Sequence, residues 1–211
     1  MYQGLIIEGV SGTGKTAVLD NLLRHTFLTD LPASSRLVLT EHHTQRVLES
    51  KEQAGSLQPR HHIELLDSIV TFLETLQART RERGWKQESL MDTDLFFILE
   101  RFHLSHVFRF PHLFWDDVVP IDSRLHAVGA RLCLLTANEA SLEKRLFARK
   151  HACWNQYLKQ YGDTPAQIVE SFAGRQKLAI HLCTQSSLPS TILDTSDLST
   201  SQITEALLHL W

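Results

Sequence analysis

The sequence predicts an α/β domain built on a parallel β-sheet that is covered by helices on both faces. Two observations support this fold class. Short apolar runs, which suit buried strands, alternate along the chain with longer stretches of helical periodicity. In addition, a glycine-studded turn leads from the first run directly into the first helical stretch. The strand candidates are Leu5–Glu8, Leu37–Thr40, Leu95–Leu99, Arg131–Thr136 and Thr191–Leu193.

The predicted helices lie between these strands. The first begins near Lys15. The second begins after Pro59, because proline suits the first turn of a helix, and ends at Gly84, a predicted C-terminal cap. Residues 84–94 are expected to form a surface loop. The later helices are expected within residues 112–129, 141–161, 166–183 and 199–210.

Length and composition indicate one globular domain spanning residues 1–211. The chain has 43% hydrophobic and 21% charged residues, and no repeat or linker divides it. Its net charge of −3 gives no basic excess, so we do not expect a nucleic acid or an anionic membrane as partner. No apolar run reaches the roughly 18–20 residues of a membrane span, and the first residues do not read as a secretion signal. We therefore expect a cytoplasmic protein.

The cysteines and histidines show no metal-binding or disulfide pattern. Cys133, Cys153 and Cys183 are an odd number without CxxC spacing, and we interpret them as reduced thiols, two of them buried. The histidine doublets at 42–43 and 61–62 have no partner at a ligand spacing. We interpret both doublets as partly exposed polar side chains.

The turn after the first strand carries the most specific motif of the chain. The segment GVSGTGKT at residues 9–16 fits G-x-x-x-x-G-K-[ST] without a mismatch. Glycines let such a backbone curl so that its N–H groups point inward, and the positive end of the next helix adds to the attraction for phosphate. Lys15 can then reach the β- and γ-phosphates, while the Thr16 hydroxyl suits Mg²⁺. The predicted phosphate-binding residues are Gly9, Ser11, Gly12, Thr13, Gly14, Lys15 and Thr16.

Glu100 and Arg101 stand where the third strand ends. Because the carboxyl ends of parallel strands lie beside the phosphate-binding turn, Glu100 is positioned to hold Mg²⁺ through water or to orient an attacking hydroxyl. Arg101 would face the same crevice and bind an anionic or hydroxyl-bearing acceptor. Taken without the turn, the pair is equally consistent with a surface ion pair.

Two arginines follow the fourth strand. Arg145 and Arg149 are four residues apart, so both guanidinium groups can point to one place from a helix. Cations that close over a transferring phosphoryl group stabilise its charge and exclude water. The alternative is a solvated basic helix face.

Other nucleotide-dependent classes leave motifs that this chain does not contain. A GTPase would show D-x-x-G and N-K-x-D, and an ABC-type ATPase would show an L-S-G-G-Q-like run. The sequence therefore favours a small-molecule kinase over these two classes.

Four segments together resemble the P-loop kinases of the thymidylate kinase and deoxynucleoside kinase group. They are GVSGTGKT at 9–16, ERFHLS at 100–105, LEKRLFAR at 142–149 and ILDTSD at 192–197. Glu100-Arg101-Phe102 with Ser105 is similar to the D-R-Y-x-x-S of thymidylate kinases and to the E-R-S of deoxynucleoside kinases. The resemblance implies a three-layer P-loop NTPase fold with five parallel strands in the order 2-3-1-4-5. It also implies a helical lid at about residues 145–162, ATP as donor, Mg²⁺, and a homodimer.

The resemblance adds three site residues. The adenine would lie near the loop after the last strand, beside Asp194 and Ser196. Glu41 follows the second strand and keeps a carboxylate that acts in deoxynucleoside kinases as the base at the acceptor hydroxyl. Its neighbours differ, because this chain has Thr40-Glu41-His42-His43 where thymidylate kinases have R-E-P-G and deoxynucleoside kinases have E-P. The thymidylate-binding Arg and Gln pattern is missing too, so thymidylate is not the expected acceptor.

The leading hypothesis is an ATP- and Mg²⁺-dependent kinase that phosphorylates a nucleoside, a nucleotide or a similar hydroxyl-bearing metabolite. Its catalytic residues would be Lys15, Glu41, Glu100, Arg101, Arg145 and Arg149, with Thr16 and Glu100 at the metal. One alternative is a nucleotide-binding regulatory module or slow ATPase without a small-molecule acceptor. Another is a kinase for nucleic-acid ends, although the charge balance favours it less.

Overall fold

A five-stranded parallel β-sheet forms the centre of the protein. The computed structural model describes residues 4–25, 36–82 and 95–209. Its strands run in the order β2-β3-β1-β4-β5, and every neighbouring pair is parallel. Fold class and strand order are therefore confirmed. The strands are β1 (Gly4–Glu8), β2 (Arg36–Leu39), β3 (Phe96–Glu100), β4 (Ala130–Thr136) and β5 (Ser190–Asp194).

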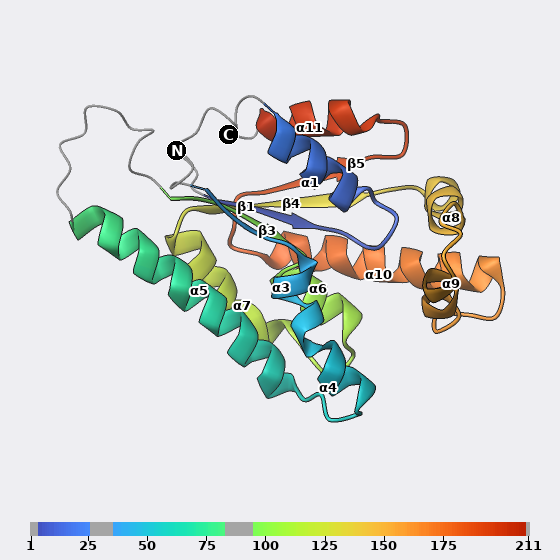
Figure 1. The fold of residues 1–211 in the computed structure, drawn as a ribbon, viewed down its shortest axis with the longest axis horizontal. Helices are drawn as coiled ribbons and strands as arrows, with labels where there is room; N and C mark the ends of the chain where they lie inside the picture. The colour runs from blue at the N-terminus through green and yellow to red at the C-terminus, as the bar shows by residue number, and fades with distance from the viewer. Residues whose placement is uncertain (1–3, 26–35, 83–94, 210–211) are drawn as a thin grey trace.

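Helices cover both faces of the sheet and produce three layers (Figure 1). On one face lie α1 (Lys15–Arg24) and α11 (Thr200–Leu208), which pack against each other. On the opposite face lie α5 (Pro59–Glu82), α6 (His103–Arg109), α7 (Trp115–Ala127) and α10 (Pro165–Gln185). Among the helices that the structure describes, none combines the length and hydrophobicity of a transmembrane span.

The core follows from the two-residue period of the strands. Along β1, Leu5 and Ile7 pack towards α1 and α11, whereas Ile6 packs towards the opposite helices. Because both faces are covered, β1 is buried along its whole length and reads as a continuous apolar run. Phe97 is buried in the core, and Phe96 is half-buried against it.

Three aromatic residues near the end of β3 differ in burial. Phe108 and Phe110 are buried, whereas Phe114 is exposed at the start of α7. The cysteine prediction is confirmed: Cys133 and Cys183 are buried, and Cys153 is exposed.

Short helices follow β2 and β4 near the carboxyl end of the sheet. Between β2 and α5 the chain forms α3 (Glu41–Thr44), η2 (Arg46–Leu48) and α4 (Glu49–Gln53). The stretch 141–161, expected to be one helical segment, forms α8 (Glu139–Phe147) and α9 (Ala152–Leu158), with a break at 148–151. The expected helix end at Gly84 and the loop at 84–94 lie outside the described residues.

The interpretation of the second histidine doublet was wrong for His62, which is fully buried on α5. Its Nδ1 lies 2.8 Å from His106 Nδ1, and its Nε2 lies 3.2 Å from His112 Nε2. His106 Nε2 donates to the Thr44 carbonyl at 2.8 Å, because a carbonyl oxygen only accepts. The tautomers follow in turn: His62 donates to His106, and His112 donates to His62. A row of three imidazoles, those of His106, His62 and His112, therefore connects α3, α5 and α6.

Burial holds two of these imidazoles, those of His62 and His106, neutral. Desolvation lowers the pKa of His62 to about 4, and it lowers the pKa of His106 to about 3. Both values lie below the ordinary value of 6.5, which applies to the unfolded chain. At a pH between the folded and the unfolded pKa, the unfolded chain therefore binds more protons than the folded chain.

We therefore expect the free energy of unfolding to fall as the pH drops from 6.5 towards 4, and to be insensitive to these two groups above 6.5. Each pH unit costs up to about 1.4 kcal/mol per histidine. Urea unfolding at pH 7, 6 and 5 measures the slope. The exposed His42 provides the control, because His42→Gln should keep the slope. Equal stability at pH 7 and pH 5 would contradict the neutral state of His62 and His106.

Candidate functional site

The loop between β1 and α1 has the backbone of a phosphate-binding turn. Gly9 adopts φ 140°, and a Cβ there would lie 2.4 Å from the Leu135 carbonyl oxygen, so a larger residue does not fit. Gly14 takes the left-handed conformation immediately before α1 and leaves its N-terminus uncovered by a side-chain cap. The first amides of α1 and its positive dipole end are thus directed to the space beyond the loop.

Lys15 lies folded over this loop. Its Nζ donates to the carbonyl oxygens of Gly9 at 2.6 Å and Val10 at 2.8 Å. Burial lowers the pKa of Lys15 well below its ordinary value, and the positive charge of Arg101 lowers it further. An arriving anion would offset both effects, so this ammonium group is suited to a phosphate.

Thr16 and Glu100 present hard oxygen ligands side by side. Thr16 Oγ1 donates to Glu100 Oε1 at 3.2 Å, and Glu100 is almost fully buried at the end of β3. A hydroxyl and a carboxylate next to a phosphate-binding loop match the ligands that Mg²⁺ prefers. The residues therefore fit a magnesium ion. Glu100 Oε2 also accepts the backbone N–H of Glu41 at 3.4 Å, which joins β3 to the start of α3.

Glu8 is an important residue that the sequence reasoning missed. It is fully buried at the end of β1, and its Oε1 accepts the backbone N–H groups of Phe102 at 2.9 Å, Leu104 at 3.1 Å and Ser105 at 3.3 Å. Its Oε2 accepts a short hydrogen bond from the Ser105 hydroxyl. One carboxylate thus holds the turn that follows Glu100. The available signal was an acidic residue inside an otherwise apolar strand.

Arg101 lies between the loop and α3 with an unusual backbone. Its φ of 53° is the positive value of a non-glycine residue, which is uncommon and concentrated at functional positions. Its Nη2 donates to Ser11 Oγ at 3.1 Å. Its Nε lies 2.6 Å from Glu41 Oε2, a charge contact whose geometry is not that of a hydrogen bond. Arg101 therefore faces the crevice and pairs with Glu41.

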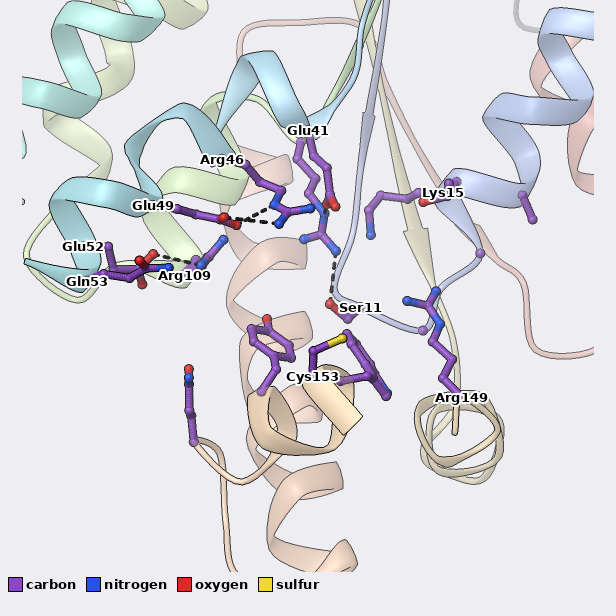
Figure 2. A pocket seen from close by; sticks show the side chains of 18 residues that line it. Ser11, Lys15, Glu41, Arg46, Glu49, Glu52, Gln53, Arg109, Arg149 and Cys153 are labelled. Atoms are coloured by element: carbon purple, nitrogen blue, oxygen red, sulfur yellow. Dashed lines mark hydrogen bonds and ion pairs between the residues drawn. The ribbon is translucent and has the colours of Figure 1, made fainter. Parts of the chain in front are cut away.

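These groups open into one cavity of about 700 Å³ (Figure 2). Lys15, Glu41 and Arg149 point into it from three different segments, and Cys153 lies on its α9 side. The cavity is large enough for a small ligand beside a phosphate chain. The lining residues are Ser11, Gly12, Gly14, Lys15, Thr16, Ala17, Glu41, Arg46, Glu49, Glu52, Gln53, Arg101, Arg109, Arg149, Cys153, Trp154, Tyr157 and Gln160.

The two arginines after β4 have different surroundings. Arg149 lines the cavity, and its guanidinium lies 4.8 Å from the Trp154 ring centroid. Arg145 does not line the cavity: it donates to Thr195 Oγ1 at 2.8 Å, the Thr195 carbonyl at 2.5 Å and the Gly12 carbonyl at 3.4 Å. The structure therefore does not bring both guanidinium groups to one place. Trp154 packs, with Nε1 donating to the Leu146 carbonyl at 2.7 Å.

The loop after β5 also lies apart from the cavity lining. Asp194 Oδ1 accepts the N–H of Ser196 at 2.9 Å and its hydroxyl at 2.5 Å. The same hydroxyl accepts the N–H of Asn138 at 2.7 Å. Thr13, also expected at the phosphate, is fully buried and donates to the Val10 carbonyl at 3.0 Å. Asp194, Ser196 and Thr13 thus stabilise the loops through their side chains in this structure.

The sequence reasoning missed the side of the cavity opposite the phosphate-binding loop. Arg46, Glu49, Glu52 and Gln53 come from η2 and α4, and Arg109 comes from the end of α6. These residues carry no motif, and only the folding of residues 41–53 over the end of the sheet brings them together.

The Glu8 contacts generate a stability prediction. Glu8→Gln replaces one acceptor oxygen by an amide, which leaves a buried donor unsatisfied and should cost about 1–3 kcal/mol. Glu170→Gln, at an exposed position of α10, should stay within about 0.5 kcal/mol. Urea unfolding measures both. Because Glu8 and Ser105 share one contact, the double variant Glu8→Gln/Ser105→Ala should lose less than the two single losses added together. Full additivity would contradict the coupling.

Comparison with known proteins shows similar structures with little sequence identity. The YorR protein of Bacillus subtilis, solved in complex with phosphorylated GDP, aligns over 98% of this chain and 94% of its own, with a TM-score of 0.60 and 16% identity. Shikimate kinase from Bacteroides thetaiotaomicron aligns over 100% and 98%, with a TM-score of 0.59 and 13% identity. A gluconokinase from Sinorhizobium meliloti aligns over 99% and 91%, with a TM-score of 0.52 and 14% identity.

No protein-family model and no curated protein sequence matches the chain. At these identities the structural likeness establishes the fold. The chain therefore has the three-layer fold, with its strands in the order 2-3-1-4-5, that it shares with P-loop kinases such as shikimate kinase.

Proposed function

We propose that the protein is an ATP- and Mg²⁺-dependent kinase that transfers the γ-phosphate to a small hydroxyl-bearing molecule. One observation carries this proposal: Lys15 of the phosphate-binding loop, Thr16, which is hydrogen-bonded to Glu100, and the carboxylate of Glu41 line one cavity. Solved proteins of similar fold include a shikimate kinase and a gluconokinase, both named for small-molecule acceptors, and this supports the same reaction class here.

The donor side of the proposed site uses the loop and its surroundings. The loop amides and Lys15 bind the β- and γ-phosphates. Thr16 and Glu100 would hold Mg²⁺, which would supply charge neutralisation for the phosphates. Arg149 approaches from the segment between α8 and α9 and stabilises the charge on the transferring group.

The acceptor side uses the pair formed by Glu41 and Arg101. Arg101 fixes the acceptor and lies against the Glu41 carboxylate. Glu41 takes the proton of the acceptor hydroxyl while the new O–P bond forms and the bond between the γ-phosphorus and the β-bridging oxygen breaks. Glu41 is half-buried, with 31% of its side chain exposed, so an acceptor can reach it.

The proposal treats residues 1–211 as one kinase domain whose lid is the segment 145–162. Within that segment, α9 presents Cys153, Trp154 and Tyr157 to the cavity. Movement of α9 towards the phosphate-binding loop would exclude water from the transfer.

The proposal predicts that Lys15→Ala lowers kcat/KM for ATP by about 100-fold or more. The reason is loss of the charge beside the β- and γ-phosphates. ADP release with a panel of sugars, polyols, nucleosides and nucleotides provides the measurement. Lys177→Ala, at an exposed position of α10, is the matched control and should keep wild-type turnover. Turnover in Lys15→Ala equal to wild type would refute the assignment. ATP binding without stimulation by any acceptor would instead favour a nucleotide-binding regulatory module.

The different contacts of the two arginines predict different kinetic effects. Arg149→Ala should lower kcat by about 10- to 1,000-fold with little change in melting temperature, because its guanidinium faces the transferring group. Arg145→Ala should lower the melting temperature and raise the KM for ATP, because its hydrogen bonds join α8 to the loops around Gly12 and Thr195. Steady-state kinetics and thermal melting of both variants measure this. A larger loss of kcat in Arg145→Ala at unchanged melting temperature would contradict the distinction.

A further inference from the structure

We propose that the acceptor is an uncharged, hydroxyl-rich molecule, such as a sugar, polyol or nucleoside, and not a phosphorylated or carboxylated one. This inference rests on the proposed function and adds the chemical class of the acceptor. It follows from the charges that line the cavity away from the phosphate-binding loop.

Each arginine on that side is already paired with a glutamate. Arg46 forms a two-pronged contact with Glu49, with Nε–Oε1 at 2.5 Å and Nη2–Oε2 at 3.2 Å. Arg109 donates from Nη2 to Glu52 Oε2 at 3.1 Å, and from Nη1 to the Gln45 side chain at 2.9 Å. These guanidinium groups therefore present hydrogen-bond donors without an uncompensated positive charge (Figure 2).

The third arginine of the acceptor side, Arg101, is also paired with a glutamate, because it lies against Glu41. Among the described lining residues, the cations without a carboxylate contact are Lys15 and Arg149. Both lie near the loop that would hold the donor phosphates. The excess positive charge of the cavity is thus concentrated at the donor end, and the acceptor end is balanced.

An anionic acceptor would fit this end poorly. A phosphate or carboxylate would lie beside Glu41, Glu49 and Glu52, or would have to displace one of them from its arginine. Like charges brought together in this way cost substantial binding free energy. A hydroxyl group has neither problem, because it can donate to a glutamate oxygen and accept from a guanidinium N–H at the same time.

Glu41 supports the same conclusion from the chemistry of transfer. An alcohol must lose its proton when it accepts a phosphoryl group, and a carboxylate at the point of transfer can take that proton. A phosphate acceptor is already ionised and needs no such base. The polar lining provides further hydrogen-bonding partners, Gln53 and Gln160.

The direct test uses inorganic phosphate as the probe of the acceptor end. The full chain is first saturated with Mg²⁺ and a non-hydrolysable ATP analogue, which occupies the donor end, and phosphate is then titrated by calorimetry. We expect no saturable phosphate binding to the wild type. The double variant Glu49→Gln/Glu52→Gln removes both compensating charges and should bind phosphate saturably, with an affinity at least about tenfold above the detection limit set by the wild-type titration. Glu143→Gln, at an exposed position of α8, is the matched control and should behave as wild type.

Saturable phosphate binding to the loaded wild type that is lost in Arg46→Ala or Arg109→Ala would overturn the inference, because it would reveal an anion site. A melting curve for each variant, recorded before titration, confirms that the variant is folded. The titration reads binding and not turnover. A chain that binds the ATP analogue but transfers no phosphate would therefore refute the proposed function and leave this result standing.

A second measurement compares acceptors as matched pairs: ribose with ribose 5-phosphate, thymidine with thymidine monophosphate, and glucose with gluconate. We expect the uncharged member to stimulate ADP release with a kcat/KM at least about tenfold higher than its charged partner. A preference for the charged member of a pair would overturn the inference.

Discussion

The candidate site depends on the hydrogen bonds that the buried carboxylate of Glu8 accepts. Glu8 ends β1, so it is covalently continuous with the phosphate-binding loop. Through Phe102, Leu104 and Ser105 it also holds the turn after β3. A carboxylate without access to water is stable only when its oxygens are saturated with donors, and this turn supplies them. The loop and the end of β3 are therefore locked in one relative position.

Because the loop and the end of β3 are fixed relative to each other, the Thr16–Glu100 pair and the Glu41–Arg101 pair are fixed as well. Glu100 reaches Thr16 because β3 ends level with the start of α1, and Arg101 turns towards Ser11 with a left-handed backbone. Thr44 secures α3 to the same place by donating to the Glu100 carbonyl at 2.5 Å. Glu41 is thereby placed at the cavity although its helix has a single turn. The strain at Arg101 is maintained by contacts from three sides.

The parts of the molecule that the sequence predicted are those encoded by local pattern. Strand positions follow from short apolar runs, and the loop follows from a motif in which glycine conformations and the lysine are set within eight residues. The strand order came from a resemblance, and the structure confirms it. These features need little knowledge of distant contacts, which explains why they could be read in advance.

The features that escaped prediction depend on packing between distant segments. The buried state of His62 is created by His106 and His112, about 50 residues away in the chain. The Arg109–Glu52 pair of the acceptor end joins the end of α6 to α4 across 57 positions of the chain, and neither segment has a recognisable spacing. Arg145 is similar: its position on a helix is readable, but its partner Thr195 belongs to the far end of the chain. A single sequence carries no signal for such pairs.

The bonds of Arg145 also determine where the chain can bend. They fasten the last turn of α8 to the Thr195 carbonyl and the Gly12 carbonyl, both of which belong to the rigid surroundings of the sheet. A closing movement that began before this residue would break those bonds, whereas one that begins after α8 would leave them intact. If the segment after α8 is the lid proposed above, its pivot would fall at residues 148–151, between α8 and α9. In the proposed closure, Arg145 would stay with the sheet, whereas Arg149 would move with α9 once the Trp154 hydrogen bond to the Leu146 carbonyl opens.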